Sequence, residues 1–192
     1  CIQALGKLKF STTELFEAGV TAISISGHKI GALSGIGALV VSKNSHSLCY
    51  PYEPIIKGGP QEKRYRGGTE NLLGAISFGK AAESLNSEIE QTSSLKNKLW
   101  NEISSNLENV LKISPENTNS NTLLINFNGL RADDLVVALD LNGVAASTGS
   151  ACSSGRQEIS HVLKAMGYEK GEAVRFSLDW DTSEESISKA AE

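Results

Sequence analysis

Four short stretches of the sequence carry side chains that could do chemistry. The first is Ser26-Gly27-His28-Lys29, which follows an alternating apolar stretch and precedes several glycines. A lysine at the end of a strand can form a Schiff base with a carbonyl group when burial favours its neutral amine. Ser26 and His28 could donate hydrogen bonds to a phosphate beside it. The alternative interpretation is an exposed lysine in an ordinary turn.

The second stretch is Arg64-Tyr65-Arg66-Gly67-Gly68-Thr69-Glu70-Asn71, which ends a long segment rich in Pro and Gly, residues 49–69. Loops of that length in compact domains are usually functional. The paired glycines expose backbone N–H groups, and a helix N-terminus beside the Thr69 hydroxyl favours an anion such as phosphate. A glycine-rich turn with a Thr69 cap and solvated arginines is the alternative.

The third stretch, residues 147–155, surrounds Cys152 with small and flexible residues. This setting predicts a solvated loop that carries a reactive or carrier thiol, although a linker that happens to contain a cysteine is the alternative. We interpret Cys1 and Cys49 as small buried side chains in a reducing compartment. The odd number of cysteines and the lack of a Cys-x-x-Cys pair argue against a disulfide scaffold and a zinc site.

The fourth stretch is Val174-Arg175-Phe176-Ser177-Leu178. The period of two in a strand predicts that Arg175 and Ser177 share one face while the apolar side chains occupy the other. An inward-facing arginine at a strand end can hold a carboxylate with two hydrogen bonds. An edge-strand arginine paired with a surface acid is the alternative.

The elements that must position these residues alternate between helix and strand, which predicts an α/β fold. Capping-box spacing predicts helix starts at Ser11 and Thr182. The polar stretch at residues 86–94 fits either a continuous helix or a boundary. The expected strands are residues 22–26, 37–42, 122–127, 144–146 and 173–178, and the expected helices are residues 72–85, 95–107, 133–141 and a turn around 159–166.

The overall composition excludes two classes of partner. The 192 residues carry a net charge of −4, so no basic surface for nucleic acid is expected. The longest apolar runs are far too short to span a bilayer, so we expect no membrane association. The residues that follow Cys1 contain neither a charged n-region nor an apolar h-region, so we expect no secretory signal in this stretch.

Several motifs, taken together and in order, make the chain resemble the cysteine desulfurases. These are pyridoxal-phosphate enzymes of the class V aminotransferase group, with fold type I. The matching motifs run along nearly the whole chain: Gln3-Ala4-Leu5-Gly6-Lys7, Ser26-Gly27-His28-Lys29, Gly35-Ile36-Gly37-Ala38-Leu39, Arg66-Gly67-Gly68-Thr69-Glu70-Asn71, Asn121-Thr122, Thr148-Gly149-Ser150-Ala151-Cys152 and Arg175-Phe176-Ser177-Leu178.

The resemblance implies roles for residues around the cofactor. Lys29 would bind pyridoxal phosphate covalently and later move protons on the substrate carbon. Ser26 and His28 would hold the phosphate of their own subunit, whereas Thr69 would reach the phosphate of a partner subunit in a homodimer. Gln3 would hydrogen-bond the phenolic oxygen of the cofactor.

The resemblance also implies a substrate and a product. Arg175 would bind the carboxylate of L-cysteine, and Cys152 would take the sulfur as a persulfide, releasing L-alanine. The sulfur would serve iron–sulfur cluster assembly, through a scaffold or acceptor protein, or tRNA thiolation. A selenocysteine lyase or another class V lyase is the alternative within this fold, and a non-catalytic assembly module is the alternative outside enzymes.

The chain matches the C-terminal half of the family. We therefore expect residues 1–88 to be the end of the large cofactor domain and residues 89–192 to be a small α/β domain. The aspartate that pairs with the pyridine nitrogen in the family falls one position before Cys1. The 192 residues alone are thus expected to be nearly inactive and to associate with another copy or with the missing half. The expected compartment is the cytoplasm, with the mitochondrial matrix as the alternative.

Overall fold

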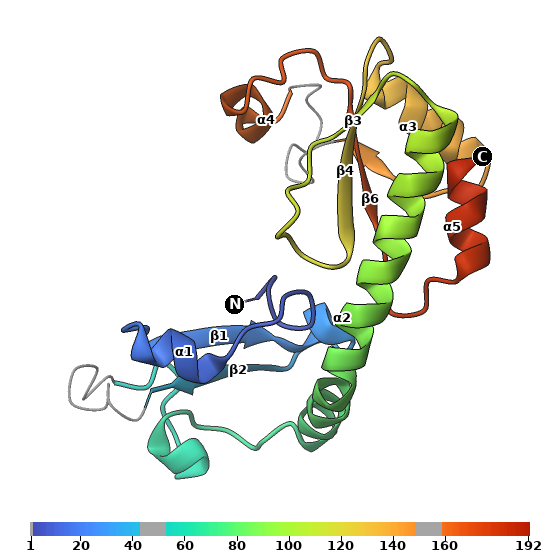
Figure 1. Ribbon diagram of the computed structural model, residues 1–192. Helices are drawn as coiled ribbons and strands as arrows, with labels where there is room; N and C mark the ends of the chain where they lie inside the picture. The colour runs from blue at the N-terminus through green and yellow to red at the C-terminus, as the bar shows by residue number, and fades with distance from the viewer. Residues whose placement is uncertain (1, 43–52, 149–158) are drawn as a thin grey trace. The chain divides into compact units, whose positions relative to one another are not determined.

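The structure is a computed structural model that describes residues 2–42, 53–148 and 159–192 (Figure 1). The chain divides into two compact units, Cys1–Ser87 and Glu88–Glu192. Strands β1 and β2 form a two-stranded sheet in the first unit, and β3, β4, β6 and β5 form a four-stranded sheet in the second. The mixture of helices and open sheets confirms the predicted α/β class.

The first unit is built on an antiparallel strand pair. Its elements are α1 (Thr12–Glu17), β1 (Ala22–Ser26), the 3-10 turn η1 (Gly27–Ile30), β2 (Gly37–Val41) and the 3-10 segment η3 (Gln61–Arg64). The Oγ atom of Ser11 accepts a hydrogen bond from the Glu14 N–H at 3.4 Å, which confirms the predicted cap of α1. Ser26 lies opposite Gly37, so the strand ladder ends where η1 begins.

Helix α2 (Leu72–Asn106) is continuous through the polar stretch that the sequence left open. The side chain of Asn71 accepts a hydrogen bond from the Gly74 N–H at 3.0 Å and so caps the helix. Thr69, the cap that one interpretation of the sequence suggested, lies outside the helix. The cap is Asn71 because its side chain stands directly before the first helical residue and reaches the free N–H groups of the first turn.

The second unit contains an antiparallel sheet with the strand order β3-β4-β6-β5. Its elements are β3 (Val110–Lys112), β4 (Thr122–Phe127), α3 (Ala132–Leu141), β5 (Ser147–Thr148), α4 (His161–Ala165), β6 (Ala173–Ser177) and α5 (Glu184–Ala191). In the register, Leu124 and Ser147 lie opposite Arg175 on its two neighbouring strands. Strand β6 is therefore an interior strand.

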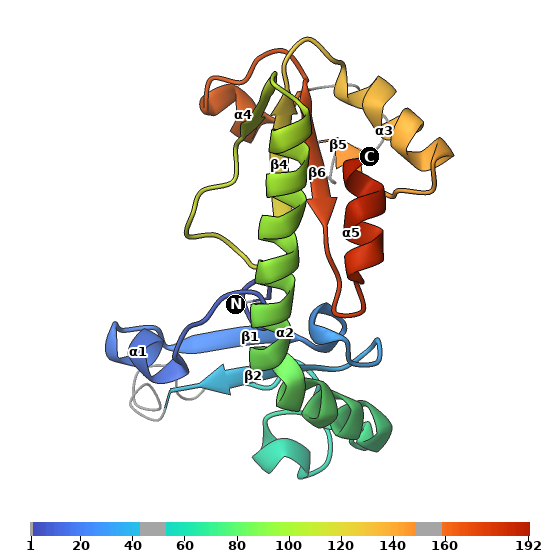
Figure 2. The ribbon, with the colours of Figure 1, turned by 45° about the vertical axis from the view of Figure 1, so that its right-hand side comes forward.

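One face of this sheet forms the main core. Leu123 and Ile125 of β4 and Val174 of β6 are fully buried and pack against Leu99 of α2. Helices α3 and α5 contribute Ala132 and Ile187 to the same cluster, and Figure 2 shows α2 passing in front of β4. The opposite face carries a smaller cluster in which Leu163 of α4 packs near Leu124.

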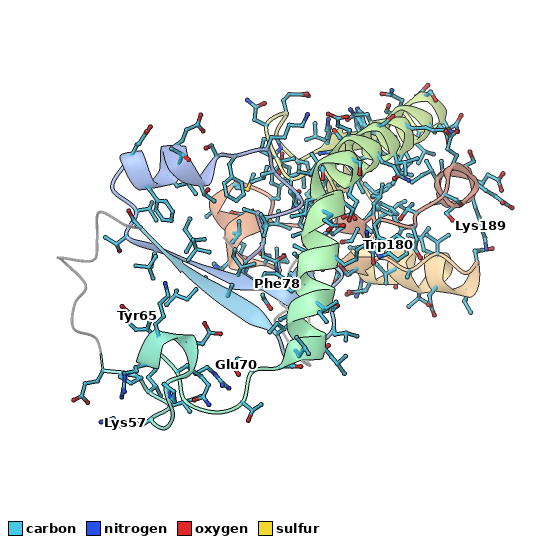
Figure 3. The ribbon with its side chains drawn as sticks, turned by 90° about the horizontal axis from the view of Figure 1, so that it is seen from below. Lys57, Tyr65, Glu70, Phe78, Trp180 and Lys189 are labelled. Atoms are coloured by element: carbon cyan, nitrogen blue, oxygen red, sulfur yellow. The ribbon has the colours of Figure 1, made fainter. Side chains whose placement is uncertain are left out.

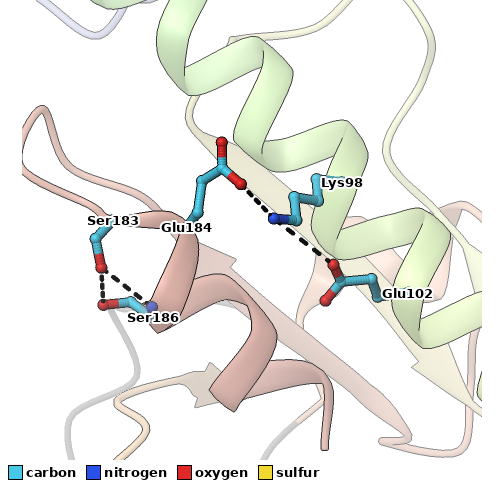
Figure 4. A network of polar contacts seen from close by, with 5 residues as sticks. All are labelled: Lys98, Glu102, Ser183, Glu184 and Ser186. Atoms are coloured by element: carbon cyan, nitrogen blue, oxygen red, sulfur yellow. Dashed lines mark hydrogen bonds and ion pairs between the residues drawn. The ribbon is translucent and has the colours of Figure 1, made fainter.

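A polar contact network links α5 to α2 within the second unit (Figure 4). The ammonium of Lys98 donates to the Glu184 carboxylate at 2.6 Å and lies 3.9 Å from Glu102. The hydrogen bond from Lys98 lowers the pKa of Glu184. Ser183 caps α5 by accepting from the Ser186 N–H at 3.1 Å.

The predicted helix start at Thr182 is therefore wrong by one residue. The Thr182 hydroxyl accepts from the Asp179 N–H at 2.8 Å, so it closes the preceding turn and is not free to cap α5.

Buried polar side chains of α2 hold the segment that leads into β4. The hydroxyls of Thr92 and Ser120 lie 2.8 Å apart, and both residues are buried. Lys96 is 5% exposed and donates to the Asn119 carbonyl at 2.7 Å. Burial lowers the pKa of Lys96, and repulsion from Lys112 adds to this effect.

Two strands differ from the sequence prediction. The expected strand at residues 144–146 is absent, β5 begins directly after it at Ser147, and β3 was not predicted at all. Both are short strands defined by pairing with a distant segment, which local alternation does not reveal. Among the described residues, none of the helices combines the length and apolar character that crossing a bilayer requires.

Candidate functional site

The turn η1 presents the lysine that the sequence singled out. Gly27 is buried, and its N–H donates to the Ile36 carbonyl at 2.9 Å. A Cβ atom at Gly27 would come within 2.9 Å of that carbonyl oxygen, so only glycine fits. The turn ends at Gly31, whose φ of 83° is left-handed. The sequence Ser-Gly-His-Lys thus forms a tight turn at the end of β1.

Two side chains in this turn are already hydrogen-bonded to each other. The Ser26 Oγ and His28 Nδ1 atoms are 2.9 Å apart. Lys29 is half-buried, and its ammonium makes no hydrogen bond or ion pair with any described residue. The turn therefore combines a hydroxyl, an imidazole and an uncommitted amine within four residues.

The N-terminal turn that carries Gln3 packs beside η1. A Cβ atom at Gly6 would lie 3.5 Å from the side chain of Ile30, the last residue of η1. The exposed side chain of Gln3 accepts a hydrogen bond from the Lys7 ammonium at 3.1 Å. The fold thus brings the segments of Gln3 and Lys29 together without placing the two side chains in contact.

Thr69 is exposed in the segment before α2. The neighbouring Gly67 is buried because its backbone packs against Gly58. The polar residue that the sequence interpretation missed here is Asn71, the cap of α2. An Asn directly before an apolar helical run was the signal that could have identified it.

Arg175 lies on the face of β6 opposite the main core. Val174, Phe176 and Leu178 are buried in that core, whereas Arg175 is half-buried and Ser177 is exposed. This confirms the predicted division of the strand into two faces. Since β6 is bordered on both sides, the alternative of an edge-strand arginine is wrong.

Cys152 lies outside the described residues. The described chain before it ends at Thr148 of β5, which pairs with Val174. The structure therefore brings Ser26, His28 and Lys29 together in the first unit and carries Arg175 in the second. In the part of the chain that the structure describes, no three His, Cys, Asp or Glu side chains gather where they could hold a metal ion.

Comparison with known proteins supports this arrangement. The family model for class-V aminotransferases matches residues 2–189. The chain belongs to the class-V aminotransferase family. Enzymes of this family group use pyridoxal phosphate, and a lysine next to a hydroxyl and an imidazole is a donor set that fits the carbonyl and phosphate groups of such a cofactor.

Curated relatives in this family are named cysteine desulfurases. The chain is 35% identical to cysteine desulfurase 2 of Trichormus variabilis, over 98% of this chain and 47% of the relative. It is 35% identical to cysteine desulfurase IscS of Dictyoglomus turgidum, over 97% of this chain and 47% of that protein. The chain thus spans about half the length of the curated relatives it matches.

Solved structures of class-V relatives have the same fold. A NifS-like protein superposes on the chain with a TM-score of 0.76 and 30% identity, over 100% of this chain and 49% of that protein. A NifS-like protein from Rickettsia africae superposes with a TM-score of 0.75 and 29% identity, over 99% of this chain and 50% of the other. The predicted fold type I architecture is therefore confirmed.

Proposed function

We propose that the chain carries part of the active site of a pyridoxal-phosphate-dependent cysteine desulfurase. Such an enzyme converts L-cysteine to L-alanine and keeps the sulfur as a cysteine persulfide. The observation that carries the proposal is the η1 turn, in which the hydrogen-bonded Ser26–His28 pair is followed by Lys29, whose ammonium bonds to none of the described residues. The family match and the relatives named cysteine desulfurases support it.

The turn fits the phosphate and the carbonyl group of the cofactor. Ser26 and His28 supply a hydroxyl and a ring N–H, which are suitable donors to a phosphate. Lys29 supplies the amine that would bond to the cofactor, and the same amine would then carry protons to and from the substrate carbon. Gln3 would hydrogen-bond the cofactor ring, and Thr69 would donate to the phosphate bound in a partner subunit.

Arg175 would bind the carboxylate of L-cysteine. The guanidinium matches a carboxylate with two parallel hydrogen bonds, and an interior strand fixes its backbone on both sides. Ser147 of β5 lies opposite Arg175, and Cys152 follows Thr148 by four residues.

Cys152 would act as the sulfur acceptor. Its thiolate would attack the substrate sulfur, forming a sulfur–sulfur bond while the bond between that sulfur and the substrate carbon breaks. The carbon keeps the electron pair and takes a proton, so that one L-cysteine and one thiol give L-alanine and one persulfide. Pyridoxal phosphate supplies the electron sink for this carbon when it is bound.

Exposed apolar side chains support association of the first unit with another chain. Leu72, Leu73 and Ile76 at the start of α2 are 69%, 74% and 61% exposed. We propose that a second copy, or the remainder of a family fold, covers them. Sedimentation equilibrium should then detect self-association, and replacing Leu73 by Ser should weaken it. A purely monomeric wild-type chain would contradict association with a second copy.

The remaining assignments belong to the same proposal. Residues 1–88 would be the end of the large cofactor domain, and residues 89–192 the small domain. The sulfur acceptor would be an iron–sulfur scaffold or another carrier protein. The accepting thiol of Cys152 must be kept from forming a disulfide, so we propose a reducing compartment, the cytoplasm, with the mitochondrial matrix as the alternative.

Cofactor attachment provides the decisive experiment. The chain is mixed with one equivalent of pyridoxal phosphate, reduced with borohydride, and digested, so that mass spectrometry identifies the modified lysine. We expect the label mainly on Lys29, and we expect Lys29→Ala to remove it. Lys80→Ala, which changes an exposed lysine of the same unit, is the control and should leave the labelling intact. Label spread evenly over the lysines would refute the assignment.

A further inference from the structure

A pocket of about 370 Å³ lies in the segment before α2, between Glu53 and Gly67. Two stretches of chain form its walls, one from Glu53 to Gly59 and the other at Arg64 and Gly67. None of Ser26, His28, Lys29 and Thr69 lines it. The pocket therefore differs from the cofactor site proposed above.

Backbone contacts fix the two walls against each other. The Gly67 N–H donates to the Ile56 carbonyl at 2.7 Å. A Cβ atom at Gly67 would come within 2.8 Å of the Cα of Gly58, so the two glycine backbones touch. Because both walls are backbone at this point, the pocket does not depend on flexible side chains for its shape.

Arg64, which contributes a positive charge to the pocket wall, has an unfavourable backbone conformation. Glu62, Lys63 and Arg64 have φ angles of 47°, 56° and 72°, which glycine adopts far more readily than other residues. Local strain of this kind persists mainly where a function requires it. Of these three residues, Arg64 is the one that lines the pocket.

The polar groups around the pocket favour an anion. The Arg64 guanidinium makes no hydrogen bond or ion pair with any described residue. Lys57 pairs with Glu53 at 3.0 Å, but both side chains are largely exposed, so this pair is weak and Lys57 can turn to another partner. In the view of Figure 3, Lys57 and Tyr65 lie on opposite sides of η3.

Backbone N–H groups provide hydrogen-bond donors in addition to the cationic side chains of Lys57 and Arg64. The N–H groups of Gly58 and Gly59 donate no backbone hydrogen bond within the described part of the chain. Neither glycine has a side chain of its own, and Gly58 meets only backbone atoms, whereas the Gln61 side chain packs against Gly59. Two cationic side chains and one carboxylate leave the pocket with an excess of positive charge.

We propose that this pocket binds a small oxyanion, either a phosphate or a carboxylate, between Arg64, Lys57 and the Gly58–Gly59 backbone. Arg64 supplies the fork of donors that fits such a group, and Lys57 supplies a second charge. The proposal does not rest on the cofactor chemistry, since it uses different residues.

The test follows the amide NMR signals of Gly58 and Gly59 as inorganic phosphate is added at constant ionic strength. A parallel titration with acetate distinguishes a phosphate site from a carboxylate site. We expect saturable shifts with at least one of the two anions. Arg64→Gly should weaken binding by about tenfold or more, as expected for the loss of one charge-assisted pair. Glu53→Gln should strengthen binding, because it removes the competing carboxylate.

Lys63→Gly is the matched control. Like Arg64→Gly, it removes one positive charge and places glycine at a left-handed position, but Lys63 does not line the pocket. It should leave the affinity nearly unchanged, and both variants should fold at least as well as the wild type. The proposal is overturned if no signal saturates or if the two glycine variants lose affinity equally. It is also overturned if Thr69→Ala abolishes binding while Arg64→Gly preserves it.

Discussion

Leu99 tests whether the second unit folds around its own core. Its side chain is 2% exposed and packs among buried residues of β4 and β6. Leu99→Ala removes three buried carbon groups, worth about 2.4 kcal/mol at about 0.8 kcal/mol each. The cavity left behind raises the expected loss in the free energy of unfolding to about 3–4 kcal/mol. A loss of this size is a large share of the total stability of a typical domain.

Urea unfolding followed by the fluorescence of Trp100 measures this loss. Trp100 packs against the same core, and the second tryptophan of the chain, Trp180, is 58% exposed and can be replaced by Phe. Leu141→Ala in α3 is the matched control, because Leu141 is 82% exposed. We expect the control to change the free energy of unfolding by less than about 0.5 kcal/mol.

Two results would refute the reasoning about this core. One is a Leu99→Ala variant that unfolds within about 0.5 kcal/mol of the wild type, which would mean that the site is not a packed interior. The other is an equal loss in the free energy of unfolding for Leu99→Ala and Leu141→Ala, which would mean that the exposure of the side chain does not determine the size of the loss.

Four further changes test other parts of the structure. Gly27→Ala should lower the free energy of unfolding by about 1–3 kcal/mol, because the new Cβ would meet the Ile36 carbonyl. The same variant should also reduce labelling of Lys29 by the cofactor. Gly79→Ala, with open space at its Cβ, should instead stabilise the chain by up to about 1 kcal/mol in thermal unfolding. Ser183→Ala should cost about 1 kcal/mol in urea unfolding through the lost cap of α5, and no change would contradict that cap. The folded state lowers the pKa of Lys96 from 10.5, so the unfolded chain binds more protons between the two values. The free energy of unfolding of the wild type, relative to that of Lys96→Met, should therefore rise as pH increases through this window. If urea unfolding shows that this difference stays constant or falls, burial of the charged amine is contradicted.

Local sequence patterns predicted the features that depend only on residues close to one another in the sequence. The alternation of residues 173–178 correctly separated Arg175 from the buried Val174, because strand geometry alone sends neighbouring side chains to opposite faces. The cap at Ser11 was confirmed for a similar reason, since its hydrogen bond spans three residues. The motifs also identified the family, and the roles of Lys29 and Cys152 remain predictions from those motifs.

The candidate site was only partly predictable. Glycine at position 27 suggested a turn, but glycine is necessary there because of the close approach of Ile36, which lies nine residues later, directly before β2. The left-handed conformation of Arg64 had no local signal, because arginine is not a residue that favours it. The sequence did predict an anion near the stretch from Arg64 to Asn71, but the approach of Lys57, Gly58 and Gly59 to that stretch had no local signal.

The sequence by itself determined the family and the periodicity of most elements, and it predicted residues for the chemistry. Only the tertiary structure decided that β6 is an interior strand and that β5 pairs Ser147 with Arg175. It also decided that α2 continues through its polar stretch, where buried Thr92 and Lys96 find partners at Ser120 and Asn119. The physical reason is that these features depend on pairing and burial between segments far apart in the chain, whereas a local pattern records only the preferences of neighbouring residues.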